Sequence, residues 1–95
     1  MKNVHFNDLI HAPNRLTICA ILEPVSEMEF ALLKEQLAVS DSVLSKHLKA
    51  LLDANYLNLK KVTQDGRQRT WLSLSKAGTD AFNAHVRALK SILGA

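Results

Sequence analysis

The chain has 95 residues, 47% of them hydrophobic, and its 12 Lys and Arg side chains against 9 Asp and Glu give a net charge of +3. This length supports one small hydrophobic core and excludes a large enzyme cleft between two domains. The single Cys19 excludes an intramolecular disulfide and a multi-cysteine zinc site.

Two helices are predicted within residues 8–22. Asn7 or Asp8 can cap a short first turn, and Pro13 suits the first position of the following helix, which is apolar on most sides. No segment approaches the length of about 18 apolar residues that spans a membrane, and the N-terminus lacks the hydrophobic region of a signal peptide. We therefore expect a cytoplasmic protein.

Residues 27–37 are predicted to form the next helix. Ser26 and Glu29 fit a capping box, in which the serine hydroxyl accepts from a helix amide and the glutamate bonds back to the start of the helix. From Phe30 onward, leucines follow at helical spacing.

A tight turn and a further helix over residues 41–54 complete a helix-turn-helix pattern. Ser40 and Asp41 offer its N-cap. The side chains expected to face inward are Val43, Leu44, Leu48, Leu51 and Leu52.

A loosely alternating pattern predicts a β-hairpin over residues 57–74 that turns at Gly66. Ser75 can cap a final helix over 76–93, in which Gly78 costs about 1 kcal/mol relative to alanine. The apolar stripe of this helix is Phe82, Val86, Leu89, Ile92 and Leu93. The order helix, helix, turn, helix, hairpin, helix predicts a mostly helical α+β fold, a winged helix-turn-helix with two or three strands, spanning residues 1–95 as one domain.

Basic residues gather on the helix 41–54 and on the hairpin. Residues 1–45 hold three Lys and Arg against six Asp and Glu, whereas residues 46–95 hold nine against three. Lys and Arg neutralise DNA phosphates, short polar residues near a helix N-terminus suit base edges, and Arg at a hairpin tip suits a narrow minor groove. The predicted DNA-binding residues are Ser40, Ser42, Ser45, Lys46, Lys49, Arg67 and Arg69.

Two points weigh against this interpretation. Any one of these lysines could belong to an ordinary solvated surface, and only the combination favours nucleic acid. Asp41 would repel phosphate, so we expect it to cap the helix, with a contact to cytosine as the alternative.

Three motifs follow one another in the chain. They are P-x-R-L-x-I at residues 13–18, S-x-H-L-x-x-L at residues 45–51, and Gly66-Arg67-Gln68-Arg69-Thr70-Trp71 in the hairpin. In order and spacing the sequence resembles the MarR/ArsR-type winged-helix transcriptional regulators, especially a compact MarR-like group, over about residues 8–93. One departure is Asn55, where the family usually has glycine; asparagine also tolerates the left-handed conformation.

The resemblance implies a dimeric, sequence-specific regulator that binds double-stranded DNA, with residues 41–54 as recognition helix and 57–74 as wing. The apolar stripe of the last helix is a candidate dimerisation surface, although part of it must cover the domain's own core. Repression is favoured over activation because no additional activating surface is evident. A small-molecule effector is possible in principle, but no residue constellation identifies one.

Two other functions remain as alternatives. A winged helix can act as a protein-interaction adaptor, and ArsR-like relatives often sense metals. Of the four histidines, His47 is expected to pack or to face phosphate, and His5 and His11 could join across a dimer, but no metal-ligand spacing is present. No catalytic motif occurs, so we expect neither an enzyme nor a cofactor.

Overall fold

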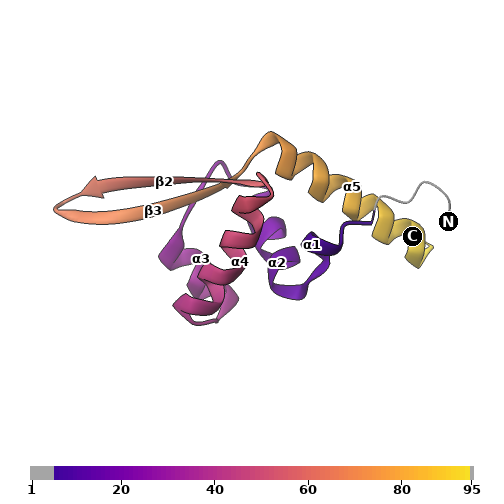
Figure 1. The fold of residues 1–95 in the computed structure, drawn as a ribbon, viewed down its shortest axis with the longest axis horizontal. Coiled ribbons are helices and arrows are strands. Elements are labelled where there is room, and N and C mark those ends of the chain that lie inside the picture. The colour runs from indigo at the N-terminus through magenta and orange to yellow at the C-terminus, as the bar shows by residue number, and fades with distance from the viewer. Residues whose placement is uncertain (1–5, 95) are drawn as a thin grey trace.

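The computed structural model describes residues 6–94. The elements are α1 (Asp8–His11), α2 (Pro13–Leu22), β1 (Met28–Glu29), α3 (Phe30–Leu37), α4 (Asp41–Asp53), β2 (Leu57–Gln64), β3 (Arg67–Leu74) and α5 (Lys76–Leu93). The molecule measures 52 × 24 × 22 Å, with the β2–β3 hairpin projecting at one end, α5 at the other, and α1 to α4 between them (Figure 1). The predicted fold class, a mostly helical winged helix-turn-helix with a small antiparallel sheet, is confirmed.

Helix α2 lies at the centre of the core. Pro13 occupies its first position, and Ile18 and Cys19 are fully buried. Burial raises the pKa of Cys19 to about 11, so the thiol stays protonated at neutral pH. Ahead of α2, the Asn7 side chain caps α1 by accepting a 2.9 Å hydrogen bond from the backbone N–H of Ile10.

The predicted capping box at the start of the third helix is wrong. Met28–Glu29 form strand β1, which pairs antiparallel with β3, with Met28 opposite Leu72. Helix α3 therefore begins at Phe30, and its N-cap residue makes no capping hydrogen bond through its side chain. Pairing with β3 replaces the capping box because it also buries the side chain of Met28.

Helix α4 follows a turn in which Ala38 has a left-handed φ of 55°. Ser40 is its N-cap, because the hydroxyl accepts a 3.2 Å hydrogen bond from the backbone N–H of Val43. Asp41, for which we expected the capping role, is instead the first residue of the helix. Val43 was expected to face inward but is 38% exposed. The buried row of α4 is Leu44, Leu48 and Leu51.

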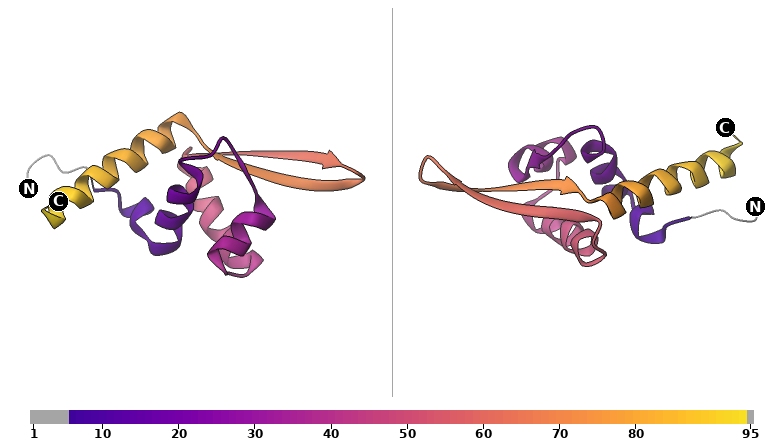
Figure 2. Two further views of the ribbon diagram at one scale, coloured as in Figure 1. Left: turned by 180° about the vertical axis from the view of Figure 1, so that it is seen from behind. Right: turned by 90° about the horizontal axis from the view of Figure 1, so that it is seen from above.

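The sheet has the order β1-β3-β2, and β2 and β3 pair along their whole length. Asp65 and Gly66 join them with φ values of 54° and 76°, as a two-residue hairpin turn requires. Asn55 adopts a φ of 63° after α4, which confirms that asparagine serves here in place of glycine. The hairpin extends well beyond the helices in both views of Figure 2.

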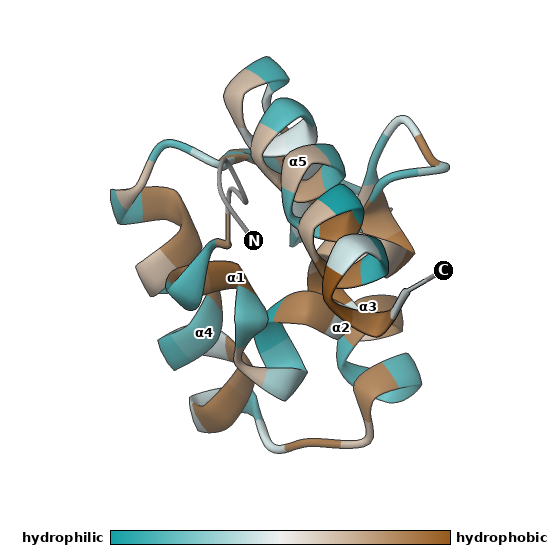
Figure 3. Cartoon of the chain, turned by 90° about the vertical axis from the view of Figure 1, so that its right-hand side faces the viewer, coloured by the Kyte–Doolittle hydropathy of each residue, from teal (hydrophilic) through white to brown (hydrophobic). Residues whose placement is uncertain are grey.

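Helix α5 begins with Ser75 as its N-cap and lies across α1 and α2, as the view along the long axis shows (Figure 3). Its buried residues are Gly78, Phe82, His85 and Ala88. The last turn leaves the body of the molecule, so that Ile92 and Leu93, which were part of the predicted stripe, are 46% and 77% exposed. Within residues 6–94, no helix is both long and apolar enough to cross a bilayer.

Candidate nucleic-acid interface

The outward face of α4 carries the predicted base- and phosphate-contacting side chains. Ser42, Ser45, Lys46 and Lys49 are all exposed, as is Ser40 at the N-cap. They lie opposite the buried leucines because the helix repeats every 3.6 residues. The structure thus brings five of the seven predicted residues together on one helix.

The two lysines of this face differ in their surroundings. Nζ of Lys49 lies 2.9 Å from Oδ2 of Asp53, one turn further along the helix. For Lys46 no ion pair is found among the residues that the structure describes. The exposed pair at Lys49 contributes little to stability, but it offsets one of the two charges that would meet phosphate.

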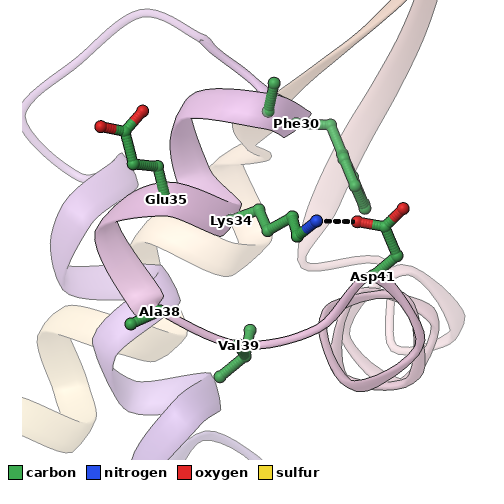
Figure 4. A pocket seen from close by; sticks show the side chains of 7 residues that line it. Phe30, Lys34, Glu35, Ala38, Val39 and Asp41 are labelled. Atoms are coloured by element: carbon green, nitrogen blue, oxygen red, sulfur yellow. Dashed lines mark ion pairs between the residues drawn. The ribbon is translucent and has the colours of Figure 1, made fainter.

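The N-terminal turn of α4 also carries an ion pair to the preceding helix. Nζ of Lys34 in α3 lies 2.7 Å from Oδ1 of Asp41. The two side chains border an open hollow of about 540 Å³ between the helices (Figure 4). Lys34 was not among the predicted site residues, because nothing in its sequence position indicates that it faces Asp41.

The two wing arginines are placed differently. Arg67 is exposed beside the hairpin turn, opposite Gln64. Arg69 lies further from the turn, and its Nη1 donates a 2.6 Å hydrogen bond to Oε2 of Glu29. No ion pair found among residues 6–94 involves Arg67. Within these residues, Arg67 therefore presents an unpaired guanidinium at the tip of the hairpin, whereas Arg69 does not.

A crevice of about 290 Å³ is lined by residues of α4 and of the hairpin. Its apolar lining includes the side chains of Phe30, Leu48 and Leu59. Its polar lining includes Ser45 and Lys49 from α4 and Lys61 and Thr70 from the hairpin. Sequence reasoning missed Lys61 and Thr70, and the signal that could have found them is the hairpin register, which sets Lys61 opposite Thr70.

The ring of His47 faces helix α2. Its Nδ1 lies 3.1 Å from Nη1 of Arg15 and its Nε2 lies 3.4 Å from Nδ2 of Asn14. Burial, followed by the charges of Arg15 and Lys46, lowers the pKa of His47, which favours the neutral ring. Of the two roles expected for this histidine, packing is the one that these contacts support.

His11 and His85 form a separate pair between α1 and α5. Nδ1 of His11 lies 3.1 Å from Nε2 of His85, which is fully buried under α1. His5 lies outside the described residues. Within the described part of the chain, no group of three or more His, Cys, Asp or Glu could hold a metal ion.

Comparisons with known proteins agree with this architecture. The family described as "Winged helix DNA-binding domain" matches residues 14–93. The uncharacterized protein MJ0432 of Methanocaldococcus jannaschii is 32% identical over 81 residues, which cover 85% of this chain and 84% of that protein.

Two solved structures show the same fold. A transcriptional regulator homologue from Pyrococcus horikoshii superposes with a TM-score of 0.89 at 22% identity, over 98% of this chain and 92% of that one. The zinc-responsive MarR family member ZitR of Lactococcus lactis superposes with a TM-score of 0.68 at 22% identity, over 98% of this chain and 68% of that one. The chain belongs to the winged helix DNA-binding domain family, and its fold is that of the MarR-type transcriptional regulators.

Proposed function

We propose that this protein binds specific sequences in double-stranded DNA as a homodimer and acts as a transcriptional repressor. The observation that carries the proposal is the outward face of α4, where serines and lysines stand exposed beside a long projecting hairpin. An isolated exposed helix would be ambiguous. A polar helix and a cationic hairpin tip together match what the major groove and the adjacent minor groove require.

In the proposed complex, α4 lies in the major groove with Ser42 and Ser45 near base edges and Lys46 and Lys49 near phosphates. The wing places Arg67 at the adjacent minor groove. The DNA strand between the grooves would then lie over the crevice between α4 and the hairpin, within reach of Lys61. Lys and Arg contacts of this kind release counterions and supply much of the affinity.

The dimer is proposed from the exposed end of α5. Ile92 and Leu93 are apolar and exposed there, and Phe6, near the start of the described chain, is 40% exposed. A second copy that covers these side chains would remove apolar surface from water. Twofold symmetry would set the two α4 helices about 34 Å apart, one turn of DNA.

Repression follows from the simplest mechanism, in which the bound dimer occupies an operator. A small-molecule effector remains a prediction. ZitR is described as zinc-responsive, but no group of metal-binding side chains among residues 6–94 favours zinc here. A protein-interaction adaptor would not need exposed cations on both α4 and the wing.

Selection of bound sequences from a pool of random duplex DNA tests the proposal. We expect an enriched motif with two related half-sites, and binding of that motif that weakens steeply between about 50 and 200 mM salt. Lys76→Ala, which removes an exposed charge at the start of α5, away from the proposed dimer surface, serves as a control that leaves binding unchanged. No enrichment, or binding that ignores salt, would favour the adaptor.

A further inference from the structure

We propose that Asp41 determines one base of the bound sequence by accepting a hydrogen bond from the amino group of a cytosine, while Lys34 neutralises its charge. This inference rests on the proposed function and identifies a specificity-determining residue within the same surface. It explains why an acidic residue stands where phosphates would repel it.

The position of Asp41 suits contact with a base. It is the first residue of α4, and its side chain is 72% exposed. Residues in the N-terminal part of a recognition helix are those that contact base edges. Ser45 follows one turn later on the same side of the helix, in the surface already proposed to face DNA.

Capping of α4 does not require the carboxylate. The hydroxyl of Ser40 already accepts from the backbone N–H of Val43. An acidic residue in the first turn interacts favourably with the helix dipole, but this effect is small at an exposed site. The ion pair to another helix is an additional feature that the dipole does not explain.

That ion pair leaves one carboxylate oxygen available. Nζ of Lys34 lies 2.7 Å from Oδ1 of Asp41, and within residues 6–94 no hydrogen bond or ion pair engages Oδ2. Figure 4 shows the pair at the edge of the hollow between α3 and α4, beside the ring of Phe30. Lys34 holds the carboxylate in place and offsets its charge, which reduces its repulsion by the DNA backbone.

The chemistry of the major groove then selects the base. Cytosine presents an amino donor there, whereas guanine and the carbonyl of thymine present acceptors that a carboxylate repels. Adenine presents an amino donor beside the acceptor N7, so it fits an asparagine, which can both donate and accept. A carboxylate at position 41 therefore favours cytosine, and an amide at the same position favours adenine.

The test repeats the random-duplex selection with the wild-type protein and with the Asp41→Asn and Asp41→Ala variants. Glu35→Gln is the matched control. Glu35 is exposed and lines the same hollow, and its replacement removes one negative charge, as the Asp41 variants do. We expect the wild-type motif to contain a cytosine that is preferred about 5- to 100-fold. In Asp41→Asn this position should change to adenine, and in Asp41→Ala it should lose its preference, while the rest of the motif is retained.

Glu35→Gln should select the wild-type motif. If both Asp41 variants also select the unchanged wild-type motif, the carboxylate does not determine a base and the inference is overturned, although the proposed function stands. If the wild-type protein enriches no motif, the proposed function itself fails and the inference fails with it. The circular dichroism spectrum of each variant shows whether it folds. We expect each to fold, because the cap of α4, Ser40, is unchanged.

Discussion

His85 and His11 are joined through their ring nitrogens, with Nε2 of His85 3.1 Å from Nδ1 of His11. On its other side, Nδ1 of His85 accepts a 3.0 Å hydrogen bond from the backbone N–H of Asn7. Since a backbone N–H can only donate, His85 carries its proton on Nε2 and donates it to His11. Both nitrogens of the buried ring are thus engaged while it is neutral, and the ring attaches the start of α1 to α5.

Stability should therefore fall in acid. Burial, followed by the charge of His11, lowers the pKa of His85, while Asp8 acts in the opposite direction. The unfolded chain, in which the pKa is near 6.5, binds the proton more readily than the native chain. We expect the melting temperature to change little between about pH 7.5 and about pH 8, and to decrease as pH falls through 6.5 toward the lowered native pKa.

His85→Gln isolates this contribution because glutamine does not titrate. The variant should be less stable than wild type at about pH 7.5, since its hydrogen bonds are poorer, but should lose less stability between about pH 7.5 and about pH 5. A smaller acid dependence should remain, because the pKa of His47 is lowered as well. An equal loss of melting temperature in variant and wild type would contradict this role for His85.

Gly78→Ala should destabilise the protein, although alanine is the better helix former. A Cβ at position 78 would lie only 2.0 Å from the backbone oxygen of Tyr56. Moving this backbone apart should cost about 1–3 kcal/mol and outweigh the gain in propensity of about 1 kcal/mol. Urea denaturation measures the difference, and Ala77→Gly, at the exposed neighbouring position, should lose only about 1 kcal/mol. A more stable Gly78→Ala would show that the contact relaxes freely.

Arg67 and Arg69 should differ in what they contribute. Arg67→Ala should weaken DNA binding and reduce the slope of log affinity against log salt by about 0.9, without loss of stability, because it removes one phosphate contact. Arg69→Ala leaves Glu29 without its partner and should lower the free energy of unfolding by about 1 kcal/mol, with little change in the salt slope. Fluorescence anisotropy across salt concentrations and urea denaturation distinguish them, and identical behaviour of the two variants would be the contrary result.

Lys46→Ala should weaken DNA binding more than Lys49→Ala. The pair with Asp53 directs the Lys49 ammonium along the helix, whereas Lys46, for which no ion pair is found among residues 6–94, is free to extend to a phosphate. Affinities for the selected duplex, measured at one low salt concentration, rank the two variants. The opposite order would mean that Asp53 releases Lys49 fully on binding.

Local signals account for most of what could be predicted about the fold. Asn7, Ser40 and Ser75 cap their helices through side-chain hydrogen bonds to residues three positions ahead, which is visible in sequence. Strand β1 could not be predicted, because its pairing with β3 joins residues more than 40 positions apart and overrides a plausible capping box. The contact of Gly78 with Tyr56 is equally non-local, so helix propensity, which is all that the sequence shows at this position, does not predict it.

The candidate site shows the same division. Exposure of Ser42, Ser45 and Lys46 follows from helical periodicity, which sequence reveals. The ion-pair partners of Arg69 and Asp41 cannot be read from periodicity. Glu29 and Lys34 belong to other elements, and each meets its partner only after the chain has folded. Tertiary contacts thus decide which charged side chains face a partner and which are already paired.

The most direct test of the central claim is a titration of ¹⁵N-labelled protein with the selected duplex, followed by the chemical shifts of backbone amides. We predict the largest changes in the first two turns of α4, around Ser42 and Lys46, and at the hairpin turn around Gly66 and Arg67. Changes confined to other elements, or an equal response to any duplex regardless of sequence, would contradict specific DNA binding through α4 and the wing.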